Sequence, residues 1–243
     1  MTNKALFLDF DGVLFNTIKE VYLVNRCIYK NINVFEPVDN KEFALYSKYK
    51  FLVYNIWMFA YYNPIIFNNT EENKIVDSFS EAILKRNREF EEKFYESFLN
   101  IRYDLIKNHY DFWKNLEEPY QFFFFIKELH EKNLIDTVVV SKKNKSSIVE
   151  RFSNYNFKFD SAKIYADEIL SSYSSKGDFI EEYMDNNNIE TAIFVDDNSN
   201  NLKTVKNDKK VKPILALWGN NIPNESGYTQ EEAEKEINYF ISK

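Results

Sequence analysis

The chain has 243 residues, 44% of them hydrophobic and 18% aromatic, enough for one large domain or two smaller ones with buried cores. The formal net charge of −7 and the absence of a basic stripe in the sequence argue against nucleic acid as a main partner. The single cysteine, Cys27, excludes an intrachain disulfide framework.

No membrane segment or leader is expected from the sequence. The most apolar stretch, residues 51–67, is interrupted by Asn55, Asn63 and Pro64 and is shorter than a typical span of about 20 residues. The N-terminal residues contain no apolar signal-peptide core. We therefore expect a cytoplasmic protein with no membrane partner, and either a monomer or a homodimer is compatible with the sequence.

The first half of the chain opens with one strand and continues with helical patterns. Residues 4–10 form a short apolar run typical of a buried strand. Thr17 and Glu20 have the spacing of a capping box, which predicts that a helix begins there. The helices expected in this half cover residues 17–31, residues 51–62 with an end at Pro64, and residues 70–116 as two or more helices.

Beyond Pro119 the pattern changes to strands that alternate with helices. Strands are expected at residues 136–141, 163–166, 191–195 and 213–217. Helices are expected at residues 120–132, 146–155, 177–186, 200–205 and 229–241. This alternation predicts an α/β fold, with a three-layer parallel-sheet core formed by residues 1–16 and 117–243. An all-helical domain, residues 17–116, is then inserted after the first strand.

Acidic pairs follow two of the predicted strands, Asp9 with Asp11 and Asp196 with Asp197. Two carboxylates about 4 Å apart repel by roughly 4 kcal/mol at an effective dielectric constant near 20. A divalent cation is the simplest way to offset that repulsion. Because sites in open parallel sheets lie beyond the carboxyl ends of the strands, we expect these acids to meet there. Asp9, Asp11 and Asp197 then supply oxygen ligands suited to Mg²⁺.

The same residues are suited to phosphoryl chemistry. A carboxylate such as Asp9 can attack phosphorus, and Asp11 can protonate a leaving alkoxide and later activate water. Ser141, at a strand end, can bind a phosphate oxygen, and Lys176 can neutralise the phosphate. Each residue alone is also typical of an ordinary turn or surface position. Four other lysines compete for the role of Lys176, namely Lys142, Lys143, Lys145 and Lys163.

In order and spacing, these residues resemble the four motifs of the haloacid dehalogenase (HAD) superfamily. The matching segments are Asp9-Phe10-Asp11-Gly12-Val13, Ser141, Lys176 and Asp196-Asp197-x-x-x-Asn201-Leu202. The resemblance covers roughly residues 1–16 and 117–220. It implies a Rossmann-like HAD core, and it implies that the inserted helices form a C1 cap that closes over the site.

The resemblance also implies a role for each matching residue. Asp9 would be the nucleophile, Asp11 the general acid and base, and Ser141 a phosphoryl ligand. Lys176 would stabilise charge beside Asp9. Asp197 and the backbone carbonyl of Asp11 would ligate Mg²⁺, with Asp196 as a further ligand or as a partner of the ligands. The chemistry implied is Mg²⁺-dependent hydrolysis of a small phosphorylated metabolite through an aspartyl-phosphate.

Other functions are also compatible with these residues. Family dehalogenases typically lack the second aspartate of the first motif, so Asp11 favours phosphoryl transfer over dehalogenation. A phosphomutase could use the same core to return the phosphoryl group to another hydroxyl. A catalytically silent binding or scaffold protein remains an alternative from a different class, although Asp9, Asp11 and Asp197 argue against it. The sequence departs from the family pattern at Gly177, where proline is frequent, and at Lys142, where a small or amide residue is expected.

Overall fold

The computed structural model describes residues 3–206 and 210–243 of the chain. It divides into two compact units, Met1–Asn16 with Glu118–Lys243 and Thr17–Glu117. We call them the sheet unit and the helical unit. The chain leaves the sheet unit through β2 (Phe15–Asn16) and returns through β3 (Glu118–Pro119), and these two short strands pair antiparallel.

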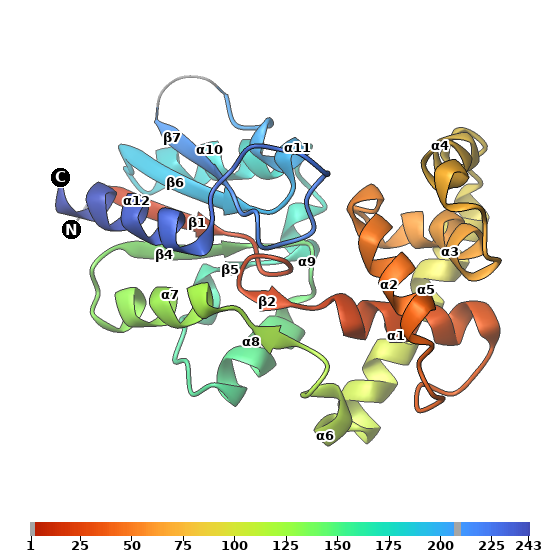
Figure 1. Ribbon diagram of the computed structural model, residues 1–243. Helices are drawn as coiled ribbons and strands as arrows, with labels where there is room; N and C mark the ends of the chain where they lie inside the picture. Colours follow the sequence, from red (N-terminus) through yellow and green to blue (C-terminus); the bar gives the residue numbers. More distant parts are fainter. Residues whose placement is uncertain (1–2, 207–209) are drawn as a thin grey trace. The chain divides into compact units, whose positions relative to one another are not determined.

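A parallel sheet with the strand order β5-β4-β1-β6-β7 forms the centre of the sheet unit (Figure 1). Its strands are β1 (Lys4–Leu8), β4 (Asp136–Val140), β5 (Ile164–Tyr165), β6 (Thr191–Asp196) and β7 (Val211–Leu215). In β1, Leu6 and Leu8 pack on one face while Phe7 packs on the other, because successive side chains of a strand alternate. Burial on both faces explains why the strand is apolar throughout.

Helices cover both faces of this sheet. One face is packed by α7 (Gln121–Glu131), α8 (Lys145–Asn154) and α12 (Gln230–Ser242). The other face is packed by α9 (Asp167–Leu170), α10 (Lys176–Asn186) and α11 (Ser199–Leu202). A single 3₁₀ turn, Ser161–Lys163, precedes β5. The expected three-layer α/β arrangement is confirmed by this topology.

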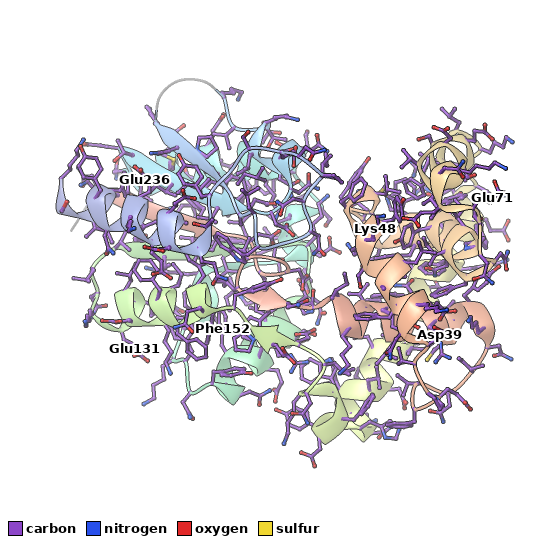
Figure 2. The ribbon with its side chains drawn as sticks, viewed as in Figure 1. Asp39, Lys48, Glu71, Glu131, Phe152 and Glu236 are labelled. Atoms are coloured by element: carbon purple, nitrogen blue, oxygen red, sulfur yellow. The ribbon has the colours of Figure 1, made fainter. Side chains whose placement is uncertain are left out.

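Aromatic side chains dominate the core between the sheet and α7, α8 and α12. Phe152 of α8, labelled in Figure 2, has its ring centroid 4.9 Å from that of Phe157 and 6.0 Å from that of Phe123. The C-terminal helix begins with a capping box, since the Thr229 hydroxyl accepts from the Glu232 backbone N–H and the Glu232 carboxylate accepts from the Thr229 N–H.

The helical unit has its own hydrophobic core, which is rich in buried aromatic residues such as Tyr46, Tyr62 and Trp113. Its helices are α1 (Ile18–Lys30), α2 (Asn40–Tyr49), α3 (Phe59–Phe67), α4 (Ile75–Leu84), α5 (Arg88–Asn108) and α6 (Tyr110–Trp113). Its 3₁₀ turns are Lys50–Leu52, Ile56–Met58 and Glu72–Lys74. Across residues 3–206 and 210–243, no helix combines the length and the apolar character needed to cross a bilayer.

The helix expected over residues 51–62 is wrong in its bounds. Two 3₁₀ turns, Lys50–Leu52 and Ile56–Met58, lie in the first part of that segment, and α3 begins only at Phe59. Pro64 lies inside α3 and does not end it. Pro64 is the sixth of the nine residues of α3, beyond the first turn, where a missing N–H costs little. The apolar side chains around Pro64 are buried, so packing outweighs the local preference.

The capping box expected at Thr17 is also wrong. Thr17 precedes α1, but its side chain makes no capping hydrogen bond. Glu20 turns into the core, where its two carboxylate oxygens lie 2.7 Å from Arg102 Nε and 2.9 Å from Arg102 Nη2. The guanidinium also lies over the Phe98 ring, 4.6 Å from its centroid. A buried bidentate ion pair therefore joins α1 to α5.

Replacing Arg102 with leucine is expected to lower the free energy of unfolding of the helical unit by about 3–5 kcal/mol, because Glu20 would remain buried without its cation. Urea denaturation of the full chain measures the effect. The matched control is the double variant Glu20→Leu/Arg102→Leu, which removes both charges and is expected to recover much of the loss. A double variant as unstable as Arg102→Leu would show that packing, not charge, explains the loss.

Candidate active site

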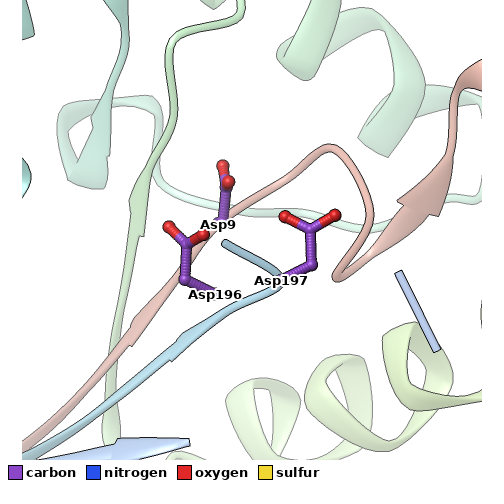
Figure 3. Close-up of side chains that lie close together, drawn as sticks. All are labelled: Asp9, Asp196 and Asp197. Atoms are coloured by element: carbon purple, nitrogen blue, oxygen red, sulfur yellow. The ribbon is translucent and has the colours of Figure 1, made fainter. Parts of the chain in front are cut away.

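Three carboxylates meet at the point of the sheet where the strand order reverses. β1 lies between β4 and β6, so successive crossovers run outward in opposite directions from it, and such a point is where ligands of open parallel sheets bind. Asp9 follows β1, Asp196 ends β6 and Asp197 comes next. One oxygen from each of these buried carboxylates lies within 4.8 Å of the others (Figure 3). The expected meeting of the two acidic strand ends is therefore observed for these three residues.

Lys176, the first residue of α10, lies among these acids. Its buried ammonium is 2.9 Å from Asp9 Oδ2 and 2.8 Å from Asp196 Oδ2. Ser175 caps the helix by accepting from the Asp178 N–H at 3.1 Å, which fixes where α10 begins. The sequence offered five lysines as candidates for the cation beside Asp9. In the structure, Lys176 contacts Asp9.

Gly177, a departure from the family pattern, has a packing reason. A Cβ at Gly177 would lie 2.3 Å from the backbone oxygen of Thr204. The Gly177 N–H also donates to the Thr204 hydroxyl at 2.9 Å. Glycine therefore lets the start of α10 approach the segment after α11 closely. This contact holds the backbone next to Lys176.

Asp196 is saturated by donors of the protein. Its Oδ1 accepts from the Asn198 N–H at 2.8 Å and from Asn201 Nδ2 at 3.1 Å. Its Oδ2 accepts from Lys176 Nζ and from Asn201 Nδ2 at 3.0 Å. A carboxylate with both oxygens engaged in this way is better suited to orienting Lys176 than to ligating a cation.

Asp197 is enclosed by two glycines and a backbone donor. A Cβ at Gly12 would lie 1.9 Å from Asp197 Oδ2, and one at Gly219 would lie 2.4 Å from Asp197 Cβ. The Asn220 N–H donates to Asp197 Oδ2 at 2.7 Å. Gly12 has a φ of 82°, in the region that favours glycine. Only residues without a Cβ fit at these two positions, so the orientation of Asp197 is tightly specified.

Among the residues that the structure describes, the group of three carboxylates does not include Asp11. The Asp11 carboxylate lies 3.3 Å from Lys143 Nζ, and its side chain is 36% exposed while that of Lys143 is 1% exposed. Asp11 is therefore the more open of the two acids in the first motif, while Asp9 is buried. A partly exposed carboxyl group held by a buried lysine is accessible to a leaving group or to water.

Ser141 follows β4 at the same edge of the sheet. β4 pairs with β1 so that Val139 lies opposite Leu8, which brings Ser141 just beyond the level of Asp9. Ser141 is buried, and its hydroxyl accepts from the Lys143 backbone N–H at 3.4 Å. The turn after β4 therefore supplies a hydroxyl and a lysine together, next to the first motif.

Charges in this site shift one another's pKa values. Burial raises the pKa of Asp9, Lys176 partly lowers it again, and the net direction is upward. For Lys176, burial alone would lower the pKa, but Asp196 and Asp9 outweigh burial and raise it. Burial and the nearby Lys176 lower the pKa of Lys142. The two neighbouring acids therefore favour the charged form of Lys176.

The donor set fits a hard divalent cation. All three grouped acids offer oxygen atoms, which Mg²⁺ prefers. Lys176 contacts two of the three buried carboxylates, and a bound divalent cation would further offset the repulsion among the three. With Asp196 engaged elsewhere, Asp9 and Asp197 are the side chains best placed to hold such a cation.

The sequence did not predict the roles that three residues of the site have in the structure. Lys143 was only one of several competing lysines, and Gly219 and Asn220 were not singled out. For Lys143 the available signal was its place two residues after a predicted strand that ends in serine. For Gly219 it was the scarcity of glycine, since a chain with only four glycines places them where backbone approach requires them.

Comparison with solved structures identifies the fold. A haloacid dehalogenase-like family hydrolase from Streptococcus pneumoniae matches 99% of this chain and 100% of its own, with a TM-score of 0.57 at 15% identity. A predicted phosphoglycolate phosphatase from Haemophilus somnus 129pt matches 99% of each chain, with a TM-score of 0.62 at 13% identity. A predicted phosphatase from Clostridium acetobutylicum matches 98% and 100%, with a TM-score of 0.58 at 15% identity.

No family model and no curated protein sequence matches the chain. The structural likeness nevertheless extends over nearly the whole of this chain and of each of the three solved structures. The chain therefore has the haloacid dehalogenase-like fold, and the resemblance seen in the sequence is confirmed at the level of the fold.

Proposed function

We propose that this chain is a Mg²⁺-dependent phosphatase that hydrolyses a small phosphorylated metabolite through an aspartyl-phosphate on Asp9. The observation that carries the proposal is the contact of Lys176 with both Asp9 and Asp196, beside Asp197, at the reversal point of the sheet. Solved structures of the same fold that are described as phosphatases support the proposal.

In the first step, Asp9 attacks phosphorus, so a bond forms between phosphorus and the Asp9 oxygen while the bond to the leaving oxygen breaks. Asp11 donates its proton to that leaving oxygen. In the second step, Asp11 accepts a proton from water, the water oxygen bonds to phosphorus, and the carboxylate of Asp9 is released. Because Asp11 is partly exposed and held by Lys143, it can reach both the leaving group and the water.

Three other groups stabilise the charge that develops on the phosphoryl oxygens. The Lys176 ammonium lies next to Asp9, and the Ser141 hydroxyl can donate to a phosphoryl oxygen. When bound by Asp9, Asp197 and the backbone carbonyl of Asp11, Mg²⁺ would supply Lewis-acid polarisation of the phosphoryl group. Asp196 keeps Lys176 in place through its network with Asn198 and Asn201.

The helical unit is proposed to act as the cap. It is inserted directly after the first motif, and its core is aromatic and internally well packed. A cap of this kind excludes water during the chemistry and selects substrates by their non-phosphate part. Substrate identity is then tested by a screen of phosphorylated sugars, nucleotides and small acids with release of inorganic phosphate as the signal.

Metal removal tests the proposal. Treatment with EDTA is expected to lower the hydrolysis of p-nitrophenyl phosphate by at least about 100-fold, because the cation supplies several kcal/mol of transition-state stabilisation. Adding Mg²⁺ back in excess should restore the rate. Turnover that EDTA leaves unchanged would contradict a metal-dependent mechanism. Conversion of a sugar phosphate to its isomer without release of inorganic phosphate would indicate a mutase.

A further inference from the structure

The loop after β7, residues 216–221, contacts both acidic segments of the site. Sequence reasoning gave this loop no role, and it contains none of the proposed catalytic groups. The Asn221 side chain donates from Nδ2 to the Asp197 backbone oxygen at 2.8 Å and to the Ala216 backbone oxygen at 3.0 Å. One carboxamide therefore ties the end of β7 to the residue that follows β6.

The same loop holds the Asp197 side chain. The Asn220 backbone N–H donates to Asp197 Oδ2 at 2.7 Å, and the Asn220 side chain approaches the same oxygen at 3.4 Å. Gly219 packs so tightly against Asp197 that a Cβ there would meet both its Cβ and its Oδ2, at 2.4 and 2.6 Å. Backbone and carboxylate of Asp197 are thus both restrained by one loop.

Trp218 extends the restraint to the first motif. Its indole Nε1–H donates to the Val13 backbone oxygen at 3.0 Å, and its ring lies 4.9 Å from that of Phe122. A Cβ at Gly219 would also lie 2.5 Å from the Gly12 backbone oxygen. The turn that carries Asp9 and Asp11 is therefore bound to the same loop that restrains Asp197.

We infer that the loop 216–221 is a positioning element that holds Asp197 and the Asp9 turn at the separation needed for cation binding, with Asn221 and Trp218 as its positioning residues. The inference rests on the proposed function only in requiring that the chain binds Mg²⁺. Removal of a residue that is hydrogen-bonded to a metal ligand typically lowers metal affinity by about 10- to 100-fold. Asn221 and Trp218 would act in this way without touching the cation or the substrate.

The test is the dissociation constant of Mg²⁺, measured by titration calorimetry on the full chain without substrate. Asn221→Ala is expected to raise the constant by about 10- to 100-fold. Trp218→Phe keeps the aromatic packing but loses the hydrogen bond to Val13, and a smaller rise of about 2- to 10-fold is expected. The matched control is Asn187→Ala. The Asn187 carboxamide also donates to a backbone oxygen, that of Tyr183. Asn187 follows the C-terminal end of α10, whereas Lys176 is at the N-terminal end of that helix.

A role in metal positioning also predicts rescue. Phosphatase turnover of Asn221→Ala should recover when Mg²⁺ is raised in proportion to its weaker binding, whereas a merely structural role would lower thermal stability and leave the dissociation constant unchanged. Equal Mg²⁺ affinity in folded Asn221→Ala, Trp218→Phe and the parent chain would overturn the inference. If Asn221→Ala does not fold, the Mg²⁺ dissociation constant of Trp218→Phe alone tests the inference. A parent chain that binds no Mg²⁺ would instead overturn the proposed function itself.

Discussion

Substituting asparagine for Asp9 is expected to reduce phosphatase turnover by a factor on the order of 10⁴ or more, as loss of a nucleophile does in other enzymes that form covalent intermediates. The substitution keeps the size of the side chain and an oxygen that can contact Lys176, but an amide cannot form an aspartyl-phosphate. It also removes a negative charge from a buried group of three carboxylates. The loss should therefore appear in turnover while the protein remains folded, and initial rates with p-nitrophenyl phosphate measure it.

The matched control is Asp185→Asn, which makes the same chemical change on an exposed part of α10. It should leave turnover within about twofold of the parent, as surface substitutions usually have small effects. A residual rate in Asp9→Asn within tenfold of the parent would show that another residue is the nucleophile. Circular dichroism of both variants separates a chemical loss from a folding loss.

The second large effect is expected at Lys176. In the absence of metal, Lys176→Met should lower the free energy of unfolding by about 3–5 kcal/mol, because buried Asp9 and Asp196 would both lose their ammonium partner. Turnover should fall as well, since the ammonium next to the attacking carboxylate would be lost. Urea denaturation in EDTA measures the stability, and Lys158→Met on an exposed position of the same unit is the control.

This stability loss should depend on pH in a defined direction. The pKa of Asp9 is already raised by burial, and Lys176 is the main group that lowers it, so its removal raises that pKa further. A carboxyl group with a folded-state pKa above its unfolded value binds more protons when folded, and its contribution to stability is lost as the pH rises through the folded pKa. The penalty of Lys176→Met should therefore be larger at about pH 8 than at about pH 5. An equal penalty at both values would contradict the charge argument.

Much of the fold and part of the site could be predicted from local pattern. Alternation of strands and helices after Pro119 predicts a parallel sheet, and a parallel sheet places its strand ends at one edge. That reasoning predicted that Asp9 lies close to Asp196 and Asp197, although more than 180 residues separate Asp9 from the other two in the sequence. Lys176 was identified through the resemblance to a known motif order, since a lysine alone is typical of a solvated surface.

Other features depend on contacts that no local pattern records. The orientation of Asp11 is set by Lys143, which is 132 residues away in the chain. Glu20 pairs with Arg102, 82 residues away, and does not cap its own helix. A buried bidentate pair with a guanidinium is stronger than a hydrogen bond from one backbone N–H. Pro64 remains in a helix because the surrounding apolar side chains are buried. In each case a tertiary contact outweighed the local preference from which the prediction was made.

The most direct test of the account is to trap the acyl phosphate during turnover. Reduction with borohydride converts an aspartyl-phosphate to homoserine, and peptide mass spectrometry locates the converted residue. The account predicts homoserine at position 9 in the parent chain with substrate and Mg²⁺, and none there when either is omitted or in Asp9→Asn. Steady turnover with no converted aspartate, or with conversion at a different residue, would contradict it.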